Sequence, residues 1–197
     1  MDLELPGPWE PSLPEVRTAS SAVCFRARGT IASVEDLRRR LRGLNAAGQV
    51  VVVVRADAAV GPDHLREALR RALRYHRQNP GLRTTVDVDA LRFIACCRQI
   101  DKALRRVGLG TGTTEVAGIA SGRLRADEVC AALGLEPLDG PWPEATVVPP
   151  ALGLPPQRQP TSPLLQVMAA MALLDLELPR RWDGGGEGHA DDGAAEP

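Results

Sequence analysis

Five consecutive valines, Val50 to Val54, limit what this chain can fold into more than any other feature. A strand that is apolar at every position has no face suited to water, so other elements must cover it on both sides. Amphipathic helical patterns lie on either side of it, from Val34 to Leu44 and from Asp63 to Gln78. We therefore expect a single mixed α/β (α+β) domain, in which a mixed or mostly antiparallel sheet of about four to five strands is flanked by helices.

Other segments supply the remaining elements. Apolar runs or alternation predict strands at Ala22 to Ala27, Leu91 to Ala95, Glu115 to Ala120 and Thr146 to Val148. Helical periodicity and capping residues predict further helices at about Ile100 to Val107, Ala126 to Leu133 and Leu164 to Leu178. Gly108 follows the first of these helices, where a left-handed cap is expected.

Composition defines the boundaries of the domain. Residues 1–180 are expected to form it, with an irregular or edge segment at 1–20, and residues 181–197 to form an acidic, glycine-rich, disordered tail. The chain lacks an apolar run of about 18 residues, and its acidic, proline-broken beginning is unlike a signal peptide. Because the four cysteines show no C-x-x-C spacing, we expect reduced thiols and a location in the cytoplasm and nucleus.

The net charge of −1 hides a strong segregation of charge. Residues 17–125 hold 21 of the 24 basic residues and 9 of the 25 acidic ones, an excess of twelve positive charges. Such a field suits a polyanion, and because aromatic residues are scarce, phosphate contacts would dominate over base stacking. An ordinary solvated face is the alternative. The candidate tRNA contacts form a stripe on each of two helices: Arg66, Arg70, Arg74 and Arg77, then Arg98, Lys102, Arg105 and Arg106.

The sequence offers little for catalysis. It has no H-E-x-x-H, G-x-S-x-G or Cys-His signature, and His64 and His76 lie too far apart on one helix to share a metal. Asp87 and Asp89 could share one face of a strand, although such pairs usually form a solvated face or pair with nearby arginines. The loop from Gly108 to Gly112 follows a helix, the wrong order for a phosphate-binding loop. We expect no enzyme, no cofactor and no metal; a nucleotide-dependent small-molecule enzyme that uses these residues is the alternative.

The segment from Leu91 to Leu109 is expected to join an apolar strand to a basic helix. It contains the pattern R-Q-I-x-x-A-L-x-x-x-G, from Arg98 to Gly108. Together with the flanking elements, this pattern resembles the PRPK-binding protein (TPRKB-type) family, the small kinase-associated subunit of the KEOPS complex, also called EKC. Cys97 stands where many members of that family have a small residue, often Gly.

The resemblance implies a non-catalytic part in forming threonylcarbamoyladenosine next to the anticodon of certain tRNAs. Members of that family bind tRNA near its 3′ CCA end and bind the small lobe of a PRPK-type atypical kinase, through which they join the other KEOPS subunits. In this chain the C-terminal helix is apolar all round, which is typical of a helix buried inside its own domain. The resemblance favours the alternative, in which one side packs on the core and the other, with its Met residues, meets the kinase. A protein–protein adaptor without RNA contact is a second alternative. The expected kinase interface is Leu164, Leu165, Met168, Met171 and Leu174.

Overall fold

The computed structural model describes residues 22–46, 49–155 and 161–178. The irregular segment expected at residues 1–20 and the tail expected at 181–197 lie outside the described residues. Within them, a four-stranded sheet has the order β2-β3-β1-β4, and every neighbouring pair of strands is antiparallel. The strands are β1 (Val23–Arg28), β2 (Val51–Arg55), β3 (Glu115–Ala120) and β4 (Glu136–Pro137).

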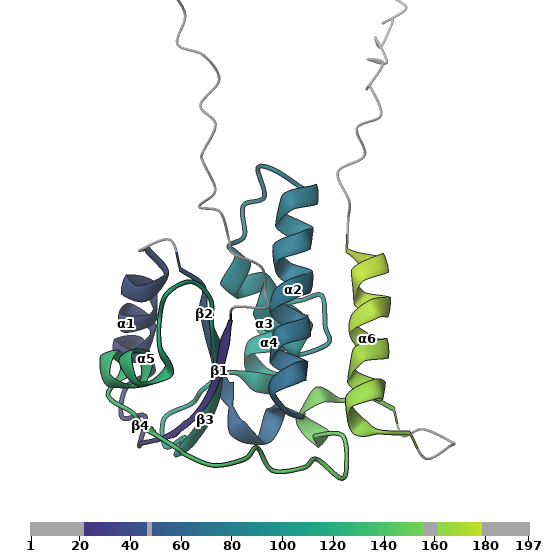
Figure 1. The fold of residues 1–197 in the computed structure, drawn as a ribbon. Coiled ribbons are helices and arrows are strands. Elements are labelled where there is room, and N and C mark those ends of the chain that lie inside the picture. Colours follow the sequence, from purple (N-terminus) through teal and green to yellow (C-terminus); the bar gives the residue numbers. More distant parts are fainter. Residues whose placement is uncertain (1–21, 47–48, 156–160, 179–197) are drawn as a thin grey trace, which may run out of the picture.

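Helices cover both faces of this sheet (Figure 1). On one face lie α1 (Val34–Ala46) and α5 (Ala126–Leu133), and on the other lie α2 (Pro62–Gln78), α3 (Val86–Ile94) and α4 (Ile100–Val107). The last helix, α6 (Pro163–Glu177), packs against α2 and α3 as an outer layer. The expected mixed α/β domain with flanking helices is confirmed.

The run of valines is buried on both faces, as its composition predicts. Val52 and Val54 join the core cluster that α2 and α3 complete, whereas Val51 and Val53 join the cluster that α1 and α5 complete. Successive side chains of a strand point to opposite faces, so one short strand supplies both cores. Burying each valine stabilises the fold by about 1.5–3 kcal/mol relative to leaving it in water.

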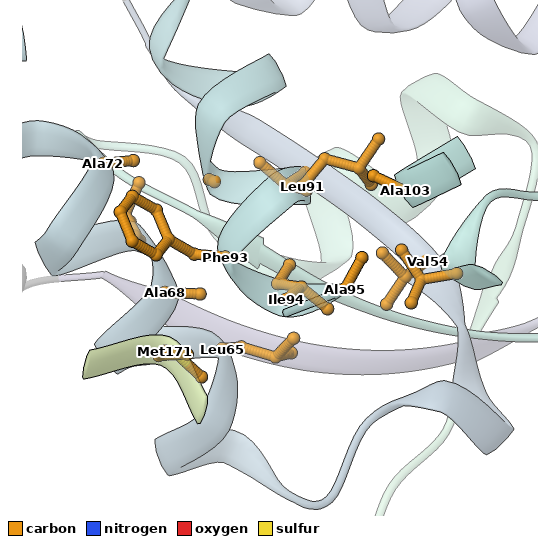
Figure 2. Packing of buried hydrophobic residues seen from close by; sticks show 14 of the residues in the cluster. Val54, Leu65, Ala68, Ala72, Leu91, Phe93, Ile94, Ala95, Ala103 and Met171 are labelled. Carbon is orange, nitrogen blue, oxygen red and sulfur yellow. The ribbon is translucent and has the colours of Figure 1, made fainter. Parts of the chain in front are cut away.

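The larger core lies between α2 and α3, and Figure 2 shows its centre. Phe93 of α3 is completely buried, and its ring lies beside Ala68 and Ala72, whose small side chains leave room for it. Met171 of α6 lies beside Leu65 in the same cluster. The outer helix is therefore attached to the domain through core residues.

The strand expected at Leu91 to Ala95 is wrong, because Val86–Ile94 is helix α3. The alternation of apolar residues over five positions was too short to decide, and the longer pattern fits a helix. Ala90, Phe93 and Ile94 are all buried, at the spacing of one helical face. Asp87 and Asp89 lie in the first turn, where the helix dipole favours negative charge.

Two smaller expectations are also wrong. Residues 146–148 form no strand; the fourth strand is β4, which pairs with Ala27 and Arg28 of β1. Gly108 ends α4 in an extended conformation, with φ −66° and ψ 157°, and its N–H bonds the carbonyl oxygen of Leu104 at 2.9 Å. The other expected helices and strands are present, and Gly134 caps α5 with φ 72°.

Candidate nucleic-acid interface

The segment from Leu91 to Leu109 folds as the end of α3, a tight turn, and α4. The turn places Cys96 at φ 49°, in the left-handed region that a residue with a side chain enters at a cost of about 1–2 kcal/mol. The position that favours glycine is therefore Cys96, one residue before Cys97. The Cys97 N–H reaches back to the carbonyl oxygen of Arg92 at 3.1 Å, which closes the turn.

A pocket of about 760 Å³ opens beside this turn. Residues from four segments line it: the end of α3, the turn together with α4, the loop after residue 152, and the end of α6. Four of the lining side chains are cationic and one, Glu177, is acidic. The pocket is therefore strongly electropositive, and its cations are Arg92, Arg98, Lys102 and Arg106.

Two of these cations are held in place by the fold. Arg106 is half-buried, and its Nη1 donates to the carbonyl oxygens of Ala95 at 3.0 Å and Cys96 at 3.5 Å. The left-handed turn at Cys96 thus places two carbonyl groups around one guanidinium. Arg92 is held by a carboxylate, because its Nη1 donates to Asp89 Oδ1 at 2.6 Å.

The other expected contacts of this segment are free to meet a ligand, although Arg98 lies in the turn before α4 and not on the helix as expected. Arg98, Lys102 and Arg105 are exposed and have no ion pair within the described ranges. Arg98 and Lys102 line the pocket, whereas Arg105 does not. Of the four residues that the sequence assigned to this helix, three therefore contribute to the pocket.

The arginine stripe of α2 differs, because acids neutralise most of it. Arg66 pairs with Asp63 at 2.9 Å and Arg70 with Glu67 at 2.5 Å, both one turn away. Arg74 pairs with Asp175 of α6, and Arg77 alone has no ion pair in the part of the chain described. The two stripes are thus not equivalent: Arg98, Lys102 and Arg105 are available, whereas the charges of α2 are largely balanced.

The residues of the enzyme alternative do not come together. Asp87 accepts a hydrogen bond from Asn45 at 3.0 Å, whereas Asp89 is completely buried and bonds to other groups. In the loop from Gly108 to Gly112, two backbone N–H groups already bond to this chain. The Gly110 N–H donates to Thr113 Oγ1 and the Gly112 N–H to the carbonyl oxygen of Ile31, each at 3.0 Å. Among the described residues, no cluster of three His, Cys, Asp or Glu could hold a metal ion.

The two cysteines at the pocket are not activated thiols. Burial raises the pKa of Cys96 to about 12 and also raises that of Cys97, against a smaller opposing effect of Arg106. At neutral pH both are protonated, and a protonated thiol is a poor nucleophile.

The residues of the expected kinase interface lie on different sides of α6, some buried and some exposed. Met171 and Leu174 are buried against this chain's own core, Leu164 and Met168 are half-buried, and Leu165 is 61% exposed. Two residues that sequence reasoning did not select, Leu173 and Leu176, are 62% and 73% exposed. The outward surface of α6, which we call the outer α6 face, consists of Leu165, Ala169, Leu173 and Leu176.

Salt bridges fix which side of α6 faces outward. Asp175 accepts hydrogen bonds from Arg71, at 3.0 Å, and from Arg74 of α2. Arg71 also pairs with Glu67 at 2.7 Å, and these half-buried groups form a network between the two helices. Asp175 therefore lies on the side of α6 that faces α2.

Comparison with known proteins assigns no family. No family model matches the chain, and no curated protein matches its sequence. No helix within the described residues has the length and apolar character needed to cross a membrane.

Proposed function

We propose that this chain is a non-catalytic subunit of a KEOPS-type complex, which holds tRNA through the pocket beside the α3–α4 turn and binds a PRPK-type kinase through the outer α6 face. It would serve the formation of threonylcarbamoyladenosine in the cytoplasm and nucleus by keeping tRNA close to the subunits that perform the chemistry. The observation that carries the proposal is the electropositive pocket formed by the R-Q-I segment.

The chemistry of the pocket suits the single-stranded end of an RNA. Its volume is in the range of small-ligand sites, which is enough to accept nucleotides of an unpaired end. The free cations Arg98 and Lys102 can neutralise successive phosphates. Leu154 offers an apolar contact for a base, in place of the aromatic platforms that many RNA-binding proteins use.

The outer α6 face supports the second half of the proposal. Three leucines and Ala169 lie at i, i+4, i+8 and i+11, which aligns them along one side of the helix. Exposed apolar stripes of this kind are used in helix-mediated protein contacts. The resemblance in the R-Q-I segment names the partner, a PRPK-type kinase.

The RNA part is tested by fluorescence anisotropy with tRNA and with the same tRNA lacking its CCA end. The double variant Arg98→Glu with Lys102→Glu should bind intact tRNA more than tenfold more weakly and lose the preference for the intact end. The matched control, Arg66→Glu with Arg70→Glu, reverses as many charges on α2 and should keep that preference. Equal binding of both tRNAs by the unmodified chain would contradict a pocket that reads the CCA end.

The kinase part is tested by co-purification with a PRPK-type kinase. Leu173→Glu should abolish the complex and leave the isolated chain folded, because that side chain is 62% exposed. Val147→Glu is the control, since Val147 is 68% exposed and lies outside α6. Kinase retention by Leu173→Glu would place the interface elsewhere.

A further inference from the structure

A buried cluster of polar side chains lies directly behind the pocket. At its centre is Asp89, whose side chain is completely buried. His76 Nε2 lies 2.7 Å from Asp89 Oδ2, and Thr84 Oγ1 donates to the same oxygen at 2.7 Å. The other oxygen, Oδ1, accepts from Arg92 Nη1 at 2.6 Å. The cluster thus connects the end of α2 and the α2–α3 loop to a side chain that lines the pocket.

Asp89 carries its negative charge in this environment. Burial acts to raise the pKa of the carboxyl group, but the hydrogen bonds from His76, Thr84 and Arg92 outweigh it and hold the pKa below its usual value. A buried carboxylate is costly unless donors and a cation compensate it, and here they do. Asp89 is therefore a fixed anion against which the guanidinium of Arg92 is placed.

Arg92 donates to one oxygen of Asp89, whereas pairs of Arg and carboxylate are frequently joined by two parallel hydrogen bonds. Here His76 and Thr84 occupy Oδ2, so Arg92 reaches only Oδ1. Arg92 Nε is buried and has no acceptor among the described residues. The described part of the chain therefore provides an acceptor for Nη1 of the guanidinium but none for Nε.

Arg92 also differs from the exposed cations of the pocket. Its side chain is 12% exposed, whereas Arg98 and Lys102 extend into solvent. A mobile Arg or Lys side chain loses rotamer freedom when it binds a phosphate, and a side chain already fixed in place does not. Arg92 can therefore contact an anion at a lower entropic cost than its neighbours.

We infer that Asp89 is a positioning residue for the pocket: with His76 and Thr84 behind it, Asp89 fixes the guanidinium of Arg92 as the pre-organised phosphate-binding group of the site. This inference rests on the proposed function, since the phosphate belongs to the RNA end that the pocket receives. Arg92 makes the contact, and Asp89 acts only through Arg92.

A double-mutant cycle tests the inference, with a short single-stranded RNA ending in CCA as the probe. Arg92→Gln should weaken binding about tenfold, the effect of losing one charge-assisted hydrogen bond. Asp89→Asn should weaken binding by several-fold in the unmodified chain and by no further amount when Arg92→Gln is already present. The folded fraction of each variant is measured by circular dichroism at the binding temperature, so that loss of folding is not counted as loss of affinity.

A third variant separates positioning from simple stabilisation. Met171→Ala removes a completely buried side chain that does not line the pocket, so it should lower the melting temperature and keep RNA affinity within about twofold. The inference is overturned if Asp89→Asn weakens binding equally with and without Arg92, or if Arg92→Gln lowers stability and leaves affinity unchanged. The second criterion applies even where Asp89→Asn does not fold.

Failure of the proposed function has a different signature. In that case the double variant Arg98→Glu with Lys102→Glu would bind the RNA as well as the unmodified chain does. If instead this variant loses binding and the cycle shows no coupling, the pocket holds RNA without the help of Asp89.

Discussion

Replacing Met171 and Leu173 in turn by Ala tests the orientation of α6, on which the outer α6 face depends. The two residues are both large and apolar and lie two positions apart on the same helix, but Met171 is completely buried and Leu173 is 62% exposed. Removing a buried methionine side chain loses its transfer free energy and leaves a cavity, for about 2–5 kcal/mol in total. Removing an exposed leucine changes stability by no more than about 0.5 kcal/mol.

Urea denaturation followed by circular dichroism measures both effects. For a domain of this size, a loss of about 3 kcal/mol corresponds to a fall in melting temperature of about 6–12 °C, so a thermal melt provides an independent check. The slope of free energy against urea concentration should stay the same, because neither change alters the surface exposed on unfolding by much. Equal losses for the two variants, or a larger loss for Leu173→Ala, would refute the orientation of α6.

Two further predictions concern His64 and Gly153. His64 is completely buried, and burial lowers its pKa from 6.5 to about 4, so the folded chain keeps it neutral while the unfolded chain protonates it below pH 6.5. The free energy of unfolding should therefore fall by about 3 kcal/mol as the pH drops from 6.5 to 4. Urea titrations at several pH values measure this fall, and the variant His64→Gln should reduce it. If His64→Gln shows the same dependence of unfolding free energy on pH, His64 is not the cause. Gly153 has φ 57°, and a Cβ there would lie 2.7 Å from Arg106 Nη2, so Gly153→Ala should destabilise the chain by about 1–3 kcal/mol and weaken RNA binding. Gly43→Ala, in α1 with open space around it, is the control and should stabilise the chain by about 0.5–1 kcal/mol in the same denaturation assay. If Gly153→Ala binds RNA as tightly as this control does, Arg106 has no role in RNA binding.

Local patterns in the sequence predict the layers of this fold well. Val50 to Val54 require cover on both faces, and the structure provides it with helices on each side of the sheet. The error at α3 came from reading Leu91, Phe93 and Ala95 as an alternation. Only the longer window from Val86 shows the helical spacing, and both periods fit a five-residue apolar run.

The charge balance of the two arginine stripes was partly visible in the sequence. Asp63 and Glu67 stand three residues before Arg66 and Arg70, a spacing that forms ion pairs on helices. The pairing of Arg74 with Asp175 could not be predicted, because it joins residues 101 positions apart. The same limit applies to the pocket, whose wall includes Gly153 and the end of α6.

The orientation of α6 could not be read from its composition. A helix that is apolar on every side gives no periodic signal, so the choice of Met171 and Leu174 as partner-facing residues had no basis in the pattern. The position of Asp175 was the available clue, since its charge needs a cation and α2 is the helix rich in arginine. Leu165 is the member of the expected interface that is exposed on the outer α6 face.

The salt dependence of tRNA binding tests most directly whether the pocket beside the α3–α4 turn holds RNA. Each phosphate contact with a single strand contributes about 0.7 to the slope of log affinity against log salt concentration. The neutralising pair Arg98→Gln and Lys102→Gln should therefore reduce the slope by about 1.4, whereas Arg66→Gln with Arg70→Gln on α2 should leave it nearly unchanged. A slope that falls equally for both pairs, or only for the α2 pair, would contradict the assignment of RNA binding to this pocket.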